Sequence, residues 1–282
     1  MKRSELAACL KLWEKDADIK HVVELGDGVS ARVFGIEYKT TRGLQRAAIR
    51  IVVSPLNLCL RESLLLNRLY QQGLLVPQCF GVKSLDKDKT AMLMEWLPGK
   101  VINRPIDIPA YVEQMAVQLA QIHAASPPPN LPKAETRLRR NVQQLINTKQ
   151  YDHWRKATGR NMPTSQKLVL LHGDYWPGNW LFQRKTLTGV VDWADACLGD
   201  PLYDLANTRF ELRWLWGDQA ADEFTQMYVG LTKLPTASLP KWDVVSLAKP
   251  ILFHNRWGLS ESQTRRLRET IVKVEQQSLR AL

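Results

Sequence analysis

Alternation of apolar and polar positions dominates the first third of the chain. Runs rich in β-branched and aromatic residues cover Ala31 to Tyr38 and Leu44 to Val53, on either side of the turn-like segment Thr40-Thr41-Arg42-Gly43. This spacing predicts a β-hairpin. Two further strands are predicted at Gln78 to Lys83 and Ala91 to Trp96, on either side of a charged turn.

Between these strands the hydrophobic period becomes helical. The segment Leu60 to Gln72 carries apolar side chains at three- and four-residue spacing and stops at Gly73. This pattern predicts an amphipathic helix with a glycine just past its C-terminus. Together these elements predict a small α+β lobe.

Beyond Leu97-Pro98-Gly99 the pattern becomes mainly helical. A helix is predicted from Ile108, and Pro127-Pro128-Pro129 ends it. The segment Leu131 to Lys156 predicts a polar helix or a helical pair. We therefore predict an α+β fold class with two domains, 1–96 and 97–282, the second larger and mainly α-helical.

Two short strands and a helical end complete this second lobe. The strands are predicted at Leu168 to Leu171 and Thr188 to Asp192, and helices are predicted through the tryptophan-rich C-terminal third. Asp200 followed by Pro201 is a typical N-cap and first helical position. We expect Asp204 in that helix to pair with the preceding loop or a neighbouring turn.

Composition favours an ordinary globular protein. The 282 residues are 45% hydrophobic, which is enough for a sizeable core, and no run approaches eighteen uninterrupted apolar residues. The N-terminus, Met1 to Lys20, mixes charged and apolar positions, so neither a signal peptide nor a membrane span is expected. The four cysteines show no zinc-ligand spacing, and we expect free thiols in a reducing cytoplasm.

A net charge of +11 would attract polyanions. Basic residues gather at Arg137, Arg139 and Arg140, and again from Arg265 to Arg268, without the interleaved aromatic residues of a single-strand-binding surface. Solvated helix faces and a functional polyanion patch both fit this pattern, and we do not expect nucleic-acid binding.

One segment places polar side chains in apolar surroundings. The sequence Leu171-His172-Gly173-Asp174-Tyr175-Trp176-Pro177-Gly178-Asn179-Trp180 precedes Val190-Val191-Asp192-Trp193 by a short turn. Phosphoryl transfer to a hydroxyl needs a carboxylate that orients the nucleophile and accepts its proton, and oxygen ligands that hold magnesium on the nucleotide phosphates. Asp174, Asn179 and Asp192 supply this set at kinase spacing. The alternative is that they cap loops and turns.

These motifs resemble the aminoglycoside phosphotransferase and choline kinase group, whose hallmark is a His-Gly-Asp-x-x-x-x-Asn loop followed by Ile/Val-Asp-Trp. The resemblance covers roughly Val22 to Ala206. It implies a bilobal protein-kinase-like fold, with ATP and Mg2+ as cofactors. Asp174 would be the catalytic base and Asn179 and Asp192 the magnesium ligands, while His172 would support the geometry of the loop. Asp195 would lie behind these residues or face solvent.

The resemblance extends to the predicted N-terminal lobe and implies that this lobe binds the nucleotide. Arg50 would grip the nucleotide phosphates, with Glu62 as its ion-pair partner, although Arg differs from the more usual Lys in presenting a planar fork. A glycine-containing loop would cover the phosphates, and a hinge would receive the adenine. The candidate residues of the loop and hinge are Gly26, Gly28, Ser30, Glu95 and Leu97.

The expected function is therefore an ATP-dependent phosphotransferase that acts on a hydroxyl of a small molecule such as an amino alcohol, a sugar or an aminoglycoside. The alternatives are a catalytically inactive nucleotide-binding scaffold and a protein kinase. Against the latter, Gly173 stands where an arginine is expected and Asp192 is followed by Trp-Ala instead of Phe-Gly. The oligomeric state cannot be predicted from the sequence.

Overall fold

The computed structural model describes residues 2–27, 31–154 and 168–282, which form two compact units. Unit 1 comprises Met1–Pro98 and Gly189–Ala194, and unit 2 comprises Gly99–Thr188 and Asp195–Leu282. The short return of the chain into unit 1 includes Asp192. The assignment of nucleotide binding to residues 1–96 and of catalysis to 97–282 stays a prediction.

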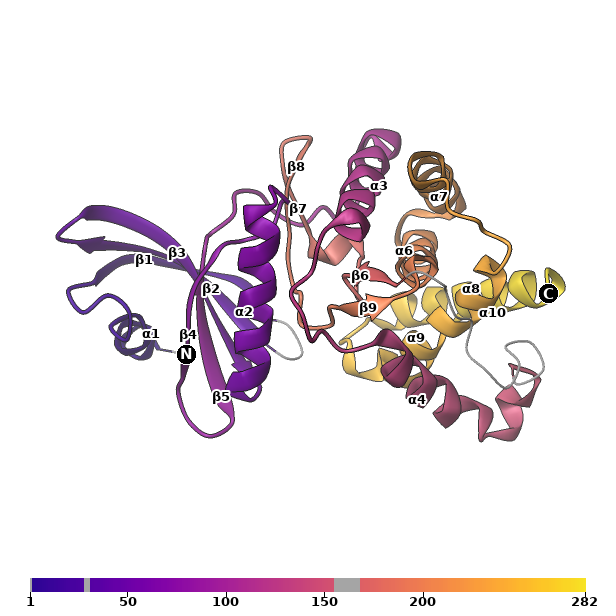
Figure 1. The fold of residues 1–282 in the computed structure, drawn as a ribbon, viewed down its shortest axis with the longest axis horizontal. Helices are drawn as coiled ribbons and strands as arrows, with labels where there is room; N and C mark the ends of the chain where they lie inside the picture. The colour runs from indigo at the N-terminus through magenta and orange to yellow at the C-terminus, as the bar shows by residue number, and fades with distance from the viewer. Residues whose placement is uncertain (1, 28–30, 155–167) are drawn as a thin grey trace. The chain divides into compact units, whose positions relative to one another are not determined.

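Unit 1 is a sheet with two helices (Figure 1). Its five strands are antiparallel and follow the order β1-β2-β3-β5-β4. Its elements, in chain order, are α1 (Arg3–Leu10), β1 (Asp18–Asp27), β2 (Ala31–Thr40), β3 (Gly43–Val53), α2 (Leu56–Gln71), β4 (Cys79–Ser84) and β5 (Lys89–Met94).

The predicted hairpin is confirmed. β2 and β3 pair antiparallel and meet at Thr40 and Gly43, where Gly43 adopts a left-handed φ of 105° that a glycine tolerates. Helix α2 begins at Leu56, four residues before the predicted start. The reason is that its first turns expose leucines, so the amphipathic pattern becomes visible only from Leu60 onward.

In unit 1, the short helix α1 and the first half of strand β1 were not predicted. The short helix α1 buries Leu6 and Leu10 against the core of the sheet, which includes Ile36 and Ile49. Strand β1 starts at Asp18, within a segment too rich in charge to read as a strand. In both cases a few contacts with the sheet stabilise an element whose own sequence pattern is weak.

Unit 2 is mainly helical. A two-stranded pairing joins β6 to β9, and another joins β7 to β8. The elements, in chain order, are α3 (Ile108–Ala124), α4 (Ala134–Ile146), the 3-10 turn η1 (Lys149–Tyr151), β6 (Val169–Leu171), the 3-10 turn η2 (Pro177–Asn179), β7 (Trp180–Gln183), β8 (Thr186–Val190), β9 (Cys197–Gly199), α6 (Pro201–Trp216), α7 (Asp218–Thr232), α8 (Leu239–Ser246), α9 (Ala248–Phe253), η3 (His254–Arg256) and α10 (Glu261–Arg280).

The central helix of unit 2 is α6, most of whose residues are buried, and α3, α7, α8 and α10 lie nearby (Figure 1). As predicted, Asp200 caps it: Oδ1 accepts a hydrogen bond from the Leu202 N–H at 2.9 Å, and Pro201 is its first residue. Within the segment predicted as helical from Leu131 to Lys156, the structure shows the shorter helix α4. The last two residues of the predicted segment lie outside the described ranges.

All four cysteines are free and buried, as expected. Among the described residues, no helix combines the length and apolar character needed to cross a bilayer. A cytoplasmic location stays a prediction.

Candidate active site

The predicted ion pair between Arg50 and Glu62 is confirmed within unit 1. Arg50 on β3 donates from Nη1 to Glu62 Oε1 on α2 at 2.5 Å, and the side chains are only 7% and 9% exposed. Burial raises the pKa of the Glu62 carboxyl, and the guanidinium of Arg50 opposes that shift. A carboxylate and a guanidinium buried together stabilise each other, because neither could be left there alone at low cost.

The second nitrogen of Arg50 reaches the segment that returns to unit 1. Nη2 lies 3.0 Å from Asp192 Oδ1, and Glu62 also receives a hydrogen bond from the backbone of Trp193. Asp192 adopts a left-handed φ of 61°, a conformation uncommon outside glycine and more frequent at functional sites. Its side chain stays 45% exposed. Three residues far apart in sequence therefore form one charged cluster with a carboxylate open to solvent.

The remaining nucleotide-site candidates are only partly described. Gly26 ends β1 opposite Val33, whereas Gly28 and Ser30 lie outside the described residues. In the predicted hinge, Glu95 donates its backbone N–H to the Gln78 carbonyl at 2.8 Å, and its carboxylate accepts from the Gln78 N–H at 3.3 Å. The Glu95 N–H is thus occupied, and its carbonyl is the backbone group of this residue that could accept a hydrogen bond from a base.

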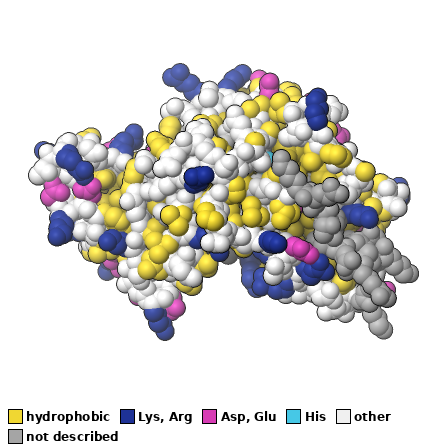
Figure 2. Space-filling model, viewed as in Figure 1, with side chains coloured by type: hydrophobic (Ala, Val, Ile, Leu, Met, Phe, Trp, Pro, Cys, Tyr) yellow, Lys and Arg dark blue, Asp and Glu magenta, His cyan; other side chains and the backbone are white. Residues whose placement is uncertain are grey.

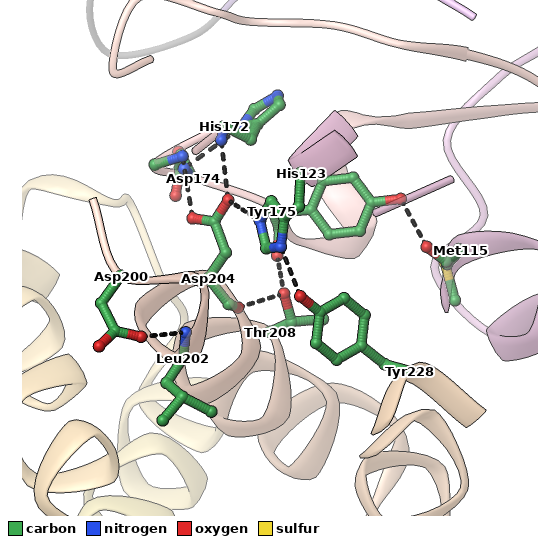
Figure 3. Close-up of polar contacts among 11 residues, drawn as sticks. Met115, His123, His172, Asp174, Tyr175, Asp200, Leu202, Asp204, Thr208 and Tyr228 are labelled. Carbon is green, nitrogen blue, oxygen red and sulfur yellow. Dashed lines mark hydrogen bonds and ion pairs between the residues drawn. The ribbon is translucent and has the colours of Figure 1, made fainter. Parts of the chain in front are cut away.

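In unit 2, the loop after β6 is held by a carboxylate from α6 (Figure 3). Asp204 is fully buried and accepts hydrogen bonds from the backbone N–H groups of His172 at 2.8 Å and Gly173 at 3.0 Å. This confirms the expectation that Asp204 pairs with the loop. Carboxylate acceptors for backbone N–H groups form stronger hydrogen bonds than neutral ones, so the loop is fixed at its start.

The same helix contacts the loop one turn later. Thr208 Oγ1 donates to the Tyr175 carbonyl at 2.7 Å. Nε2 of His123 lies 3.3 Å from Asp204 Oδ2, and Nδ1 of that ring hydrogen-bonds the Tyr228 hydroxyl at 2.5 Å. Helices α3, α6 and α7 therefore meet behind the loop in a buried polar network (Figure 3).

Asp174 and Asn179 lie together in this loop. The Asp174 backbone N–H donates to His172 Nδ1 at 3.2 Å, and its carbonyl accepts from Asn179 Nδ2 at 2.9 Å. His172 is fully buried and orients the loop, which agrees with the predicted supporting role. The Nδ2 contact orients the amide of Asn179, and its Oδ1, an acceptor, takes no part in this hydrogen bond.

Gly173 is required by its surroundings. Its φ of 80° is left-handed, and an added Cβ would lie 2.3 Å from the Asp195 carbonyl oxygen and 2.9 Å from Arg137 Nη2. No side chain fits there without a shift of the backbone. An arginine, as expected at this position in protein kinases, is therefore incompatible with this loop.

The sequence did not point to Lys249, which is the nearest cation to Asp174 among the described residues. Its Nζ on α9 donates to Asp174 Oδ1 and lies 3.9 Å from Asp195 Oδ2. Asp195 Oδ1 pairs in turn with Arg137 Nη1 at 2.5 Å, so Asp195 belongs to the site. The available signal was a single lysine in the apolar run from Val244 to Phe253, which forms no motif.

Glu211 is a second carboxyl close to Asp174. It is 5% exposed, and no hydrogen bond or ion pair is formed by its carboxyl group among the described residues. Burial and the charge of Asp174 raise its pKa to about 8, while Lys249 opposes the shift. Glu211 therefore holds its proton at neutral pH, and the two neighbouring carboxyls differ in environment.

The basic segment of α4 does not form one surface. Arg137 turns toward Asp195, whereas Arg139 pairs with Glu135 one turn away at an exposed position. On the face shown in Figure 2, Lys and Arg side chains lie at scattered points, and several gather near the lower edge beside an acidic side chain. This arrangement favours solvated helix faces over a polyanion patch.

Comparisons with known proteins identify the fold. The chain resembles the crystal structure of aminoglycoside phosphotransferase APH(4)-Ia at 13% sequence identity, with a TM-score of 0.70 and coverage of 99% of both chains. It also resembles an aminoglycoside 2″-phosphotransferase in complex with GDP and kanamycin at 15% identity, a TM-score of 0.68, and coverage of 98% and 99%.

A third structure is the type VIII aminoglycoside 3′-phosphotransferase, at 16% identity with a TM-score of 0.59 and coverage of 96% and 98%. No curated protein matches in sequence. These likenesses show a kinase-like α+β fold. A profile of the phosphotransferase enzyme family matches residues 21–237, which is most of the chain, and the protein therefore belongs to that family.

Proposed function

We propose that this protein is an ATP- and magnesium-dependent kinase that phosphorylates a hydroxyl group of a small molecule. The observation that carries the proposal is the geometry of Asp174. Its backbone is fixed on both sides by His172 and Asn179, while its carboxylate stays 23% exposed. A carboxylate held in this way is suited to orient an acceptor hydroxyl and accept its proton.

The reaction would proceed by direct transfer. The acceptor oxygen forms a bond to the γ-phosphorus, and the bond from that phosphorus to the bridging oxygen breaks, with its electron pair leaving on the nucleoside diphosphate. The hydroxyl proton passes to the Asp174 carboxylate and then to solvent. Arg50 is held in place by Glu62. Its guanidinium can pair with two phosphate oxygens at once, so it would bind the phosphates of the nucleotide during the transfer.

Asn179 and Asp192 would hold magnesium. The donor set fits, since Asn179 offers an amide oxygen and Asp192 a partly exposed carboxylate. Among the described residues, no group of three or more His, Cys, Asp and Glu side chains could hold a metal ion. A magnesium ion that travels with a nucleotide uses one or two protein oxygens together with the phosphates. When bound, it would neutralise charge on those phosphates.

The nucleotide and the acceptor are proposed from two kinds of observation. One similar structure is a ternary complex with AMP-PNP and hygromycin B, and another holds GDP and kanamycin. The predicted hinge follows the end of β5 at Met94, and its backbone groups at Glu95 and Leu97 are the ones proposed to pair with a base. An amino alcohol, a sugar or an aminoglycoside would be the acceptor.

The test is nucleotide consumption by the purified protein with magnesium, using ATP and GTP in turn, across a panel of small alcohols, sugars, amino alcohols and aminoglycosides. The Asp174→Asn variant is the blank. Acceptor-dependent consumption that is absent from the blank supports the proposal and identifies the acceptor class. Nucleotide binding without turnover on any acceptor favours the inactive scaffold, and turnover only with protein acceptors favours a protein kinase.

A further inference from the structure

The backbone and the carboxylate of Asp174 have different hydrogen-bond partners. The backbone is fixed within the loop by His172 and Asn179. Among the described residues, the one hydrogen-bond partner of the carboxylate is the ammonium group of Lys249. The rotation of this side chain about its own bonds therefore depends on a residue 75 positions later in the chain.

The position of Lys249 is fixed by the packing of its helix. It lies on α9, where its neighbours Ala248 and Pro250 are buried, and α9 packs against α4 and α8. Its side chain is 23% exposed. A pair at this depth is less screened by solvent than an exposed pair, and less rotational freedom is lost when it forms.

A second layer of charge holds the ammonium. Asp195 Oδ2 lies 3.9 Å from Lys249 Nζ, and the other oxygen of Asp195 is paired with Arg137 at 2.5 Å. Positive and negative groups thus alternate from α4 to the loop. Burial opposes the charge on Lys249, but Asp174, Tyr203 and Asp195 together outweigh it and raise the pKa of the lysine above its ordinary value, so the ammonium form persists at neutral pH.

We propose that Lys249 is a positioning residue of the phosphoryl transfer, which orients the Asp174 carboxylate toward the acceptor hydroxyl while Asp195 and Arg137 hold the ammonium in place. The proposal rests on the proposed function, because a fixed orientation matters only if Asp174 receives the acceptor proton. Displacement of a catalytic group by about 1 Å can lower a rate by about 10²-fold.

The first test is Lys249→Ala, with Lys241→Ala as the matched control. Lys241 lies on α8 and forms no ion pair among the described residues. We expect kcat to fall about 10²-fold in Lys249→Ala, with the KM for the nucleotide unchanged. Propylammonium should restore part of kcat in a saturable way, whereas sodium at equal ionic strength should not. The control should keep the wild-type kcat.

The second test does not depend on activity. In protein labelled with 15N at lysine, the ammonium resonance of Lys249 should shift in Asp174→Asn and stay in place in Asp88→Asn, which changes an exposed carboxylate of the β4–β5 turn. If the chemical shift of this resonance does not change in Asp174→Asn, the pair does not exist in solution and the proposal is overturned.

The outcomes separate the two proposals. If the wild type turns over and Lys249→Ala stays within three-fold of it, or if propylammonium gives no rescue, the positioning role is wrong and the kinase function stands. If the wild type consumes no more nucleotide than Asp174→Asn with every acceptor, the kinase function fails, and the positioning role fails with it.

Discussion

Arg50 and Glu62 form an ion pair at 2.5 Å in which both side chains are more than nine-tenths buried. Removal of the carboxylate leaves a buried guanidinium with only the partly exposed Asp192 as its partner. We expect Glu62→Ala to lower the free energy of unfolding by about 3–5 kcal/mol, measured by chemical denaturation.

The matched control is Glu37→Ala, which breaks the pair with the largely exposed Arg46 and should lower the free energy of unfolding by less than about 1 kcal/mol. Equal losses in the two variants would contradict the structural role given to the buried pair.

Asp192 is expected to act in nucleotide binding. Its carboxylate touches Arg50 and remains open to a cation, so Asp192→Ala should weaken magnesium-dependent nucleotide binding. Asp174→Asn keeps both proposed magnesium ligands and should bind the nucleotide as the wild type does, although its turnover should fall by about 10²- to 10⁴-fold. Calorimetry with and without EDTA distinguishes the cases. Unchanged affinity in Asp192→Ala, with magnesium present, would refute its role.

Asp204 lies in α6 and Asp200 caps the same helix, but the replacement of each carboxylate by an amide should have different effects. In Asp204→Asn the new NH2 group meets one of the two backbone N–H groups that the carboxylate accepts, so a buried donor loses its partner. We expect a loss of about 3 kcal/mol in the free energy of unfolding. Asp200→Asn keeps an N-cap acceptor for Leu202 and should lose less than about 1 kcal/mol. A reversed order of these losses would contradict the assignment.

The Glu211 carboxyl predicts a pH dependence of stability. Its pKa rises from 4.5 to about 8 on folding, so between these values the folded protein binds its proton more tightly than the unfolded chain does. The free energy of unfolding therefore falls as pH rises toward 8. The groups facing it are Asp174, which strengthens this effect, and Lys249, which opposes it.

We expect Glu211→Gln to remove this dependence. Relative to the wild type, the variant should become more stable by on the order of 3 kcal/mol between pH 5 and pH 8. Urea unfolding at both pH values checks this. The exposed Glu269→Gln is the control and should parallel the wild type. A wild-type-like slope in Glu211→Gln would show that this carboxyl is ionised in the folded protein.

Elements with a strong local signal were predicted closely. The β2–β3 hairpin and the start of α3 at Ile108 follow from alternating or helical periods together with turn or capping residues. Helix α1 and the first half of β1 were missed, because their sequences carry little periodicity and only the sheet stabilises them. The early start of α2 at Leu56 was missed because exposed leucines obscure its polar face.

For the site, the sequence alone determined which groups are chemically suited to phosphoryl transfer. The spacing of Asp174, Asn179 and Asp192 encodes residue types that such a reaction needs, and a short loop brings Asp174 and Asn179 together without any help from distant segments. Local chain geometry decides such relationships, so they can be recognised in a linear pattern.

Only the tertiary structure decided which distant groups hold those residues. Lys249, Asp195 and Arg137 reach Asp174 or each other from separate elements, and Glu211 becomes a buried carboxyl only because α6 is enclosed by other helices. Charge and burial act through space over a few ångströms. No spacing along the chain encodes such distances, since they arise only when the helices of unit 2 pack.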